Sequence, residues 1–179
     1  MHFIQVFEKA ECIVCPSGSC VAMVTHHYPE LFADDPHWLA RAEKVGGNIF
    51  ELTEFLVDVL HISDVGAAYQ GTVTYHDSCH LLRTLGVGRQ PRELLSRVRG
   101  LTLVEMAQSD RCCGFGGSFS IKYPDISTAL VADKVDRILE TGADTVVGCD
   151  MGCLLNIEGY LTRMGHPVKV KHIAEVLAP

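Results

Sequence analysis

The cysteines of this chain lie next to predicted strand ends, and this placement constrains the fold most. Cys79, the adjacent pair Cys112 and Cys113, and Cys153 each follow a short apolar or β-branched run that ends in a turn. The three runs are 72–75, 101–105 and 145–148. Because the carboxyl ends of parallel strands meet at one edge of a sheet, we expect these four thiols to converge there.

Strands and helices alternate along the chain. This order predicts an α/β fold with a mainly parallel sheet, flanking helices and βαβ units, and with the cysteine site at the carboxyl ends of the strands. Further short strands are expected at 12–15 and 168–170. Apolar residues at helical spacing predict helices at 1–9, two within 36–60 separated near Gly46 and Gly47, one from Leu81, one over 126–139 and one at 173–177.

The chain contains two copies of one strand–turn–helix unit. Aligning Cys20 with Cys153 superposes the two copies, and the similarity continues into the closing helix of each. The second copy is preceded by a long segment, 72–142, that has no counterpart before the first copy. We therefore expect 1–63 to be the carboxy-terminal half of a truncated first unit and 72–179 to be a complete second unit.

Four soft ligands at one site suit either an iron–sulfur cluster or zinc. Neighbouring side chains in extended backbone point apart, so Cys112 and Cys113 bridge a larger cluster more readily than they bind one tetrahedral zinc ion. Gly114 removes a side chain beside the thiolates, which lets backbone amides donate hydrogen bonds to sulfur. The pattern favours Cys79, Cys112, Cys113 and Cys153 as cluster ligands, with zinc as the alternative.

Other polar residues near these cysteines allow several roles. His76 and His80 flank the first cysteine, where a histidine can tune a cluster by hydrogen bonding, donate a proton, ligate, or simply be satisfied by the backbone. Asp77 is expected to cap the helix that follows. Cys12 and Cys15 have a Cys-X-X-Cys spacing, but residues three apart in a strand face opposite ways, so we expect them to pack in the core.

Composition excludes several classes of function. A net charge of −7 without a basic run argues against a nucleic-acid surface. The amino terminus lacks the features of a signal peptide, and no apolar stretch is long enough to cross a bilayer. We therefore expect a cytoplasmic protein, a compartment in which eight cysteines indicate metal or redox chemistry rather than disulfides.

Five strings in the chain resemble one known family in order and spacing. They are PSGSC (16–20), YHDSCH (75–80), CCGFGG (112–117), DMGC (150–153) and HIAEV (172–176). The pattern resembles the CCG, or cysteine-rich, domain of the lactate utilization protein A family, which also occurs in the iron–sulfur component of glycolate oxidase and in one component of heterodisulfide reductase. The resemblance implies that Cys79, Cys112, Cys113 and Cys153 hold a [4Fe-4S]-type cluster and that Cys20 belongs to the site of the first unit.

The chain departs from the family pattern at one ligand position. Asp150 stands where the first cysteine of the domain's Cys-X-X-Cys is found, and Ser17 stands there in the first copy. The neighbouring Cys149 is a candidate for a fifth thiolate, and Asp150 is a candidate ligand through oxygen, a harder donor that suits iron–sulfur centres less well. Four thiolates are the favoured set.

The resemblance also implies a function. The chain is expected to be an oxidoreductase component, the iron–sulfur electron-transfer subunit of a complex that oxidises L-lactate, or a similar 2-hydroxy acid such as glycolate, together with two other lactate-utilization subunits. It is not expected to be active alone, and the shortened first unit is expected to impair it. The alternatives are a component of the heterodisulfide or thiol reductase type and a zinc-stapled interaction module without catalysis.

Overall fold

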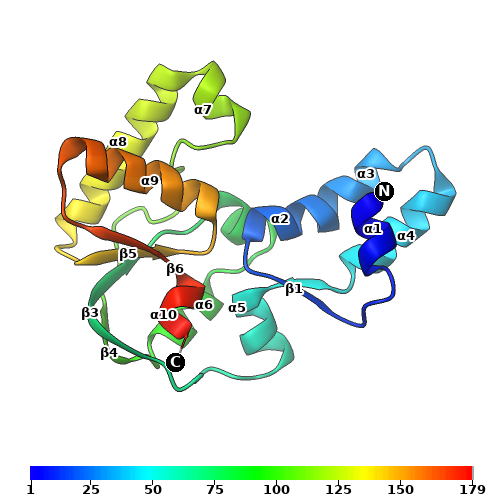
Figure 1. Ribbon diagram of the computed structural model, residues 1–179, viewed down its shortest axis with the longest axis horizontal. Helices are drawn as coiled ribbons and strands as arrows, with labels where there is room; N and C mark the ends of the chain where they lie inside the picture. The colour runs from blue at the N-terminus through cyan, green and yellow to red at the C-terminus, as the bar shows by residue number, and fades with distance from the viewer. Residues whose placement is uncertain (179) are drawn as a thin grey trace.

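Two parallel sheets organise the chain, and helices flank them (Figure 1). The computed structural model describes residues 1–178 and confirms the predicted α/β fold with parallel strands. The amino-terminal part consists of α1 (His2–Phe7), β1 (Ile13–Cys15), α2 (Gly18–Ala22), η1 (Met23–His27), α3 (Tyr28–Leu31), α4 (Pro36–Gly46), β2 (Ile49–Glu51), α5 (Leu52–Glu54) and η2 (Phe55–Val59). The remainder consists of β3 (Ala68–Tyr75), η3 (His80–Thr84), α6 (Arg89–Leu95), β4 (Arg99–Leu103), α7 (Ser118–Lys122), α8 (Pro124–Glu140), β5 (Thr145–Gly148), α9 (Met151–Met164), β6 (Lys169–His172) and α10 (Ile173–Leu177).

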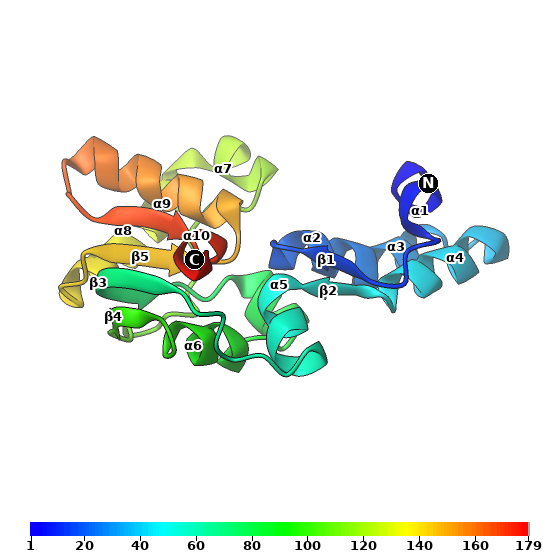
Figure 2. The same ribbon diagram turned by 60° about the horizontal axis from the view of Figure 1, so that its bottom comes forward.

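The larger sheet has the strand order β4-β3-β5-β6, and every pairing in it is parallel (Figure 2). All four residues of β5 are buried, as expected for a central strand covered on both faces. Val146 packs into the core beneath α8 and α9, whereas its neighbour Val147 packs into the core on the side of α6 and α10. The alternation of side chains along the strand thus builds two cores on one sheet.

The smaller sheet corrects one sequence prediction. Residues 36–60 were expected to form two helices, but Ile49–Glu51 is strand β2, which pairs in parallel with β1. Over such a short run the apolar residues of this segment fit the periodicity of a helix and that of a strand equally well, and the pairing with β1 selects the strand. The next helix begins only after Glu51, which forms a capping box with Glu54.

Equivalent positions in the two predicted repeats occupy equivalent places in the structure. Strand β1 leads into α2 and pairs with β2, just as β5 leads into α9 and pairs with β6. Each second strand ends in a capping box, formed by Glu51 in the first repeat and by His172 in the second. This correspondence agrees with the expected repeat, while the division into a partial and a complete unit stays a prediction.

Within the described part of the chain, no helix combines the length and the apolar character that a bilayer span requires.

Candidate metal centre

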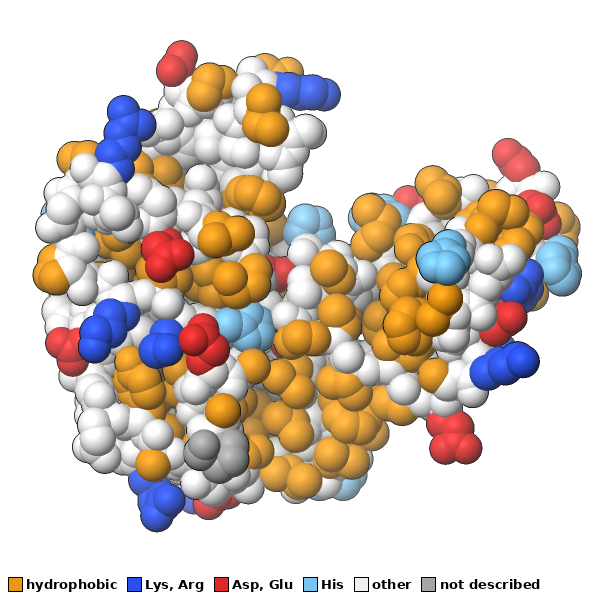
Figure 3. Space-filling model, viewed as in Figure 1, with side chains coloured by type: hydrophobic (Ala, Val, Ile, Leu, Met, Phe, Trp, Pro, Cys, Tyr) orange, Lys and Arg blue, Asp and Glu red, His pale blue; other side chains and the backbone are white. Residues whose placement is uncertain are grey.

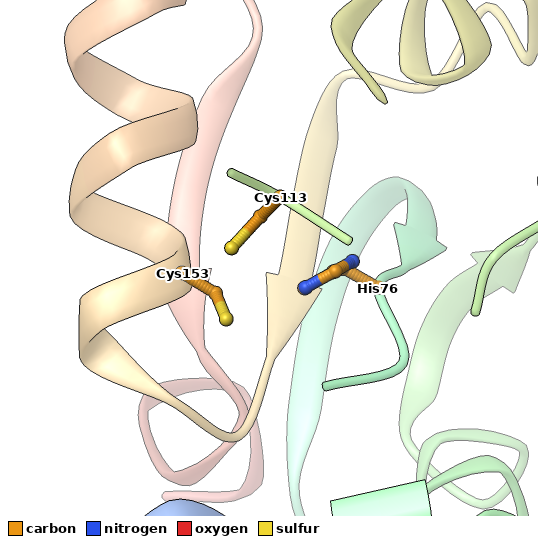
Figure 4. A group of neighbouring side chains, drawn as sticks. All are labelled: His76, Cys113 and Cys153. Carbon is orange, nitrogen blue, oxygen red and sulfur yellow. The ribbon is translucent and has the colours of Figure 1, made fainter. Parts of the chain in front are cut away.

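Three side chains from separate elements meet at the carboxyl edge of the larger sheet. His76 follows β3, Cys113 lies in the loop after β4, and Cys153 lies in the first turn of α9. One ligand atom from each residue lies within 4.8 Å of the others, and the side chains point toward one another (Figure 4). The spacing is that of a group able to hold a metal ion.

His76 carries the clearest sign of a ligand. Its side chain is 1% exposed, and neither ring nitrogen has a hydrogen-bond partner among the described residues. A buried polar group without a partner costs roughly 1–3 kcal/mol. Burial, assisted by the charge of Lys134, lowers the pKa of His76 to about 4, so the ring is neutral and offers a lone pair for coordination.

The other two predicted ligands lie beside this group. Burial raises the pKa of Cys79, and the nearby Cys112 raises it further. All four predicted thiols line one cavity together with Asp150 and His80. The exposed His80 places Nδ1 3.7 Å from the Cys79 sulfur. The structure thus brings the four cysteines into one region, with His76, Cys113 and Cys153 as its tightest part.

The thiols of this region hold their protons strongly. Hydrogen bonding to Cys113 and burial raise the pKa of Cys112 well above its usual value. For Cys113, the hydrogen bond with Cys112 lowers the pKa, but contact with Cys153 and burial outweigh it and raise the pKa to about 12. Metal coordination requires thiolates, so loading the site releases protons.

The loop that carries Cys112 and Cys113 is held by contacts to two helices. The Gly114 N–H donates to the Cys112 sulfur at 3.3 Å, the kind of amide–sulfur bond expected from the glycines. Ser127 on α8 donates to the carbonyl of Gly114 at 2.8 Å, and Asn156 on α9 donates to the carbonyl of Cys113 at 2.7 Å. Gly114 has φ +81°, and a Cβ there would overlap the Ser127 carbonyl. Glycine is therefore required at this turn.

Asp150 joins the two repeats rather than pointing a free carboxylate at the thiols. One oxygen accepts hydrogen bonds from the Ser17 hydroxyl at 2.9 Å, the Ser19 amide at 3.0 Å and the Ser19 hydroxyl at 2.6 Å. The other oxygen accepts from the hydroxyl of Ser78. Burial disfavours the carboxylate, but these donors outweigh it and lower its pKa. Both oxygens are engaged, and Asp150 and its counterpart Ser17 contact each other.

Asp77 is structural, but the predicted helix cap is wrong. Cys79, not Asp77, is the N-cap residue of η3, and no side chain caps this helix. Asp77 instead accepts two hydrogen bonds from Arg92, at 2.9 and 2.7 Å. Arg92 also pairs with Glu105 and lies 5.1 Å from the centre of the Tyr75 ring. The ion pair fixes the turn between β3 and Cys79 against α6.

The remaining cysteines lie outside the group formed by His76, Cys113 and Cys153. Cys149 is 1% exposed in the core on the side of α6, where it shares a hydrogen bond of 3.2 Å with the Tyr75 hydroxyl, and it does not line the cavity. Cys12 is exposed, so the expectation that it packs in the core is wrong; it precedes β1, whose pairing begins at Ile13. Cys15 and Cys20 line the cavity from the amino-terminal part.

The cavity lies between the two parts of the chain and measures about 750 Å³. The space-filling view shows a broad notch there, with hydrophobic side chains on the amino-terminal wall (Figure 3). That wall includes Phe3, Phe7, Ile13 and Met23, whereas the facing wall carries the four thiols predicted as ligands. No lysine or arginine is among the described lining residues.

The residues that support the site are not identifiable from the sequence pattern. Ser78, Ser127 and Asn156 hold the loops through single hydrogen bonds, and no spacing pattern announces such contacts. Lys134 differs, because it lies on the apolar stripe of α8 beside Val131 and Val135. A lysine at a core position is a visible sequence signal.

The segment that carries the four cysteines matches a known domain family. Residues 73–158 match the CCG family, described as a cysteine-rich domain. Lactate utilization protein A of Bacillus cytotoxicus is 56% identical over 176 residues, which cover 98% of this chain and 73% of that protein. The proteins of the same name from Bacillus cereus and an Exiguobacterium species are each 54% identical, with 73% and 72% of their lengths covered.

The fold and the thiol site define an α/β protein with a cysteine-rich domain. The extent and level of identity identify the family: the chain belongs to the lactate utilization protein A family.

Proposed function

We propose that this chain is an iron–sulfur electron-transfer subunit of a complex that oxidises L-lactate or a similar 2-hydroxy acid such as glycolate. The observation that carries the proposal is the convergence of Cys79, Cys112, Cys113 and Cys153 on one cavity wall beside the unpartnered, buried His76. The names of the relatives supply the link to lactate.

The residues of the site fit a cluster of the [4Fe-4S] type. Four thiols give a soft ligand set, and the N–H of Gly114 already donates to the sulfur of Cys112. His76 is available as a further ligand or as a donor to sulfur, because neither nitrogen is otherwise engaged. Such a cluster supplies one-electron transfer, with a potential set by ligation, hydrogen bonding and burial.

The composition of the cavity supports oxidation of the 2-hydroxy acid at another subunit. Recognition of a carboxylate usually employs arginine or lysine, and the described lining has neither. Mostly apolar side chains instead surround the thiols. We therefore propose that the chain receives electrons from a partner, and that its assembly includes two other lactate-utilization subunits.

We propose a cytoplasmic location, because eight cysteines in one chain are more typical of metal or redox chemistry in a reducing compartment than of a disulfide framework.

Lactate-dependent reduction of the complex tests this function. The chain is co-expressed anaerobically with its two partner subunits, and the isolated complex is mixed with L-lactate or glycolate while electron paramagnetic resonance is recorded. The proposal predicts a reduced-cluster signal that requires both the 2-hydroxy acid and Cys113, and that is absent from a complex with Cys113→Ser. A loaded complex that dithionite reduces but neither acid reduces contradicts the assigned role.

Zinc binding is a second candidate, favoured by one observation. His76, Cys113 and Cys153 alone make a compact group of three ligands, a set compatible with tetrahedral zinc. A zinc-stapled interaction module predicts about one zinc per chain without sulfide, in protein made anaerobically with abundant iron. The metal content therefore separates the two candidates.

A further inference from the structure

Lys134 is a fully buried cation next to the candidate metal centre. Its side chain is 0% exposed, and among the described residues it is the one buried lysine or arginine. Nζ donates to the carbonyl oxygens of Ser109 at 3.0 Å and Gln108 at 3.2 Å, and it lies 3.8 Å from the sulfur of Met106. All three acceptors are neutral.

Within residues 1–178, no carboxylate lies within salt-bridge distance of the Lys134 ammonium. Arg92 shows the contrast, because it contacts both oxygens of Asp77 and also pairs with Glu105. A buried charge without an opposite charge is strongly unfavourable unless the group gives up its proton or an anion is supplied. Burial lowers the pKa of Lys134, and the largest opposing influence comes from Cys113.

The position of Lys134 on α8 places it behind the loop that carries the thiols. Gln108 and Ser109 belong to the segment leading into Cys112 and Cys113. Cys113 packs in the same core as Val131 and Val135, which flank Lys134 on α8. The lysine thus holds the incoming segment by its carbonyls, and its charge lies close enough to influence His76 and Cys113.

We propose that Lys134 is a positioning residue that serves as the built-in counterion of an anionic, thiolate-ligated metal centre. The inference rests on the proposed function only in requiring thiolate ligation, and it applies to a cluster and to a single thiolate-bound metal alike. Thiolates that bind metal in this buried region carry negative charge, and Lys134 is the unpaired buried cation that compensates it. Asp77, Asp110 and Asp133 raise the pKa of Lys134, but each of them pairs with an arginine instead, so no carboxylate of the described residues contacts the Lys134 ammonium.

The role predicts the sign of a change in reduction potential. Adding an electron increases the negative charge of the centre, so a nearby cation favours the reduced state. Replacing Lys134 with the uncharged methionine removes this effect and lowers the potential. If the substitution only loosened the loop and admitted water, the more negative reduced state would be better solvated and the potential would rise. The sign therefore distinguishes a charge effect from a merely structural one.

The experiment uses the full chain with three substitutions. Lys134→Met removes the charge at similar length, Lys134→Arg keeps the charge, and Lys44→Met removes an exposed charge from α4 as the control. Cobalt(II) affinity is measured from thiolate-to-cobalt absorption in anaerobic, metal-free protein. The midpoint potential of the iron–sulfur form is measured by redox titration, and circular dichroism verifies folding of each variant.

Lys134→Met is expected to weaken cobalt binding at least tenfold. It is also expected to shift the one-electron reduction equilibrium about tenfold toward the oxidised form, which lowers the midpoint potential by about 59 mV. Lys44→Met is expected to match the unsubstituted chain, and Lys134→Arg to recover most of the affinity. If Lys134→Met does not fold, a tenfold loss in folded Lys134→Gln supports the inference, and unchanged affinity there overturns it. Unchanged affinity or a raised potential in folded Lys134→Met also overturns it.

The outcomes separate this inference from the proposed function. A chain that binds cobalt through its thiols but assembles no iron–sulfur cluster contradicts the electron-transfer role, and the cobalt affinities still decide the role of Lys134. A chain that assembles the cluster while Lys134→Met behaves like the unsubstituted chain overturns the counterion alone. A folded chain that binds neither metal overturns both.

Discussion

Replacing Asp150 with alanine tests how the two repeats are joined beside the thiols. The carboxylate accepts hydrogen bonds from Ser17 and Ser19 in the amino-terminal part and from Ser78 next to Cys79. Asp150 is the N-cap residue of α9, whose first turn carries Cys153. The substitution therefore removes a junction between three segments while leaving every cysteine in place.

The magnitude follows from the exposure of the donors. Ser78 is 1% exposed and loses its acceptor without replacement by water, at about 1–3 kcal/mol. Ser17 and Ser19 are partly buried, so water replaces the acceptor and each loss is about 0.5–1.5 kcal/mol. Relief of the buried charge of Asp150 offsets part of this sum. We expect a net loss of about 3 kcal/mol in the free energy of unfolding.

Urea denaturation of the metal-free chain at pH 7 measures this loss. Asp150→Asn keeps the side-chain volume and one acceptor oxygen, so it is expected to lose less free energy of unfolding than Asp150→Ala. Asp136→Ala, at an exposed position on α8, is expected to stay within about 0.5 kcal/mol of the unsubstituted chain. A double-mutant cycle of Asp150→Ala with Ser78→Ala is expected to give a coupling of about 1 kcal/mol or more. A loss below about 1 kcal/mol, or strict additivity with Ser78→Ala, refutes the reasoning.

Three further predictions concern the surroundings of the site. Arg92→Leu leaves Asp77 buried and unpaired and is expected to lower stability by about 3 kcal/mol at pH 7. Burial raises the pKa of Asp77, but Arg92 outweighs burial and lowers this pKa overall. Without Arg92 the folded variant protonates Asp77 at higher pH than the unsubstituted chain does, so the charge-dependent part of the deficit in urea titrations shrinks as pH falls toward the lowered pKa and is gone below it; a pH-independent deficit contradicts this. Burial raises the pKa of Glu51, so ionising this carboxyl costs stability increasingly as pH rises from about 4.5. Glu51→Gln is therefore expected to gain stability relative to the unsubstituted chain between pH 5 and 8 in thermal unfolding. A stability difference that does not change with pH would show that the pKa of Glu51 is not raised. Gly114→Ala places a methyl group against the Ser127 carbonyl at a residue with positive φ. It is expected to lower stability by about 1–3 kcal/mol and to weaken cobalt binding. Unchanged cobalt binding contradicts the requirement for glycine at this turn.

All strands except β2, and the convergence of the cysteines, were accessible from sequence because they follow simple rules. Strand β5 is a short, apolar run bounded by turn signals, and parallel pairing brings such strand ends together. The short strand β2 was not accessible, because its residues also suit a helix and only pairing with β1 selects the extended form. Local periodicity therefore fails where a strand is three residues long.

The roles of the polar residues were harder to predict, because they depend on partners distant in sequence. Asp77 was expected to cap the following helix, but Arg92 offers it two charged hydrogen bonds instead. Asp150 was considered as a ligand, but three serines engage its oxygens. Neither partner is identifiable from spacing. In both cases charge-assisted hydrogen bonds across the fold set the surroundings of the carboxylate, and whether Asp150 also ligates a metal stays a prediction.

The content of iron and acid-labile sulfide tests the central claim most directly. Both are measured per chain in protein purified without oxygen, alongside Cys113→Ser at the site and Cys12→Ser at an exposed cysteine outside it. The account predicts stoichiometric iron and sulfide in the unsubstituted chain and in Cys12→Ser, and their loss in Cys113→Ser. Folded, anaerobically purified chain that contains zinc without sulfide, or neither iron nor sulfide, would contradict it.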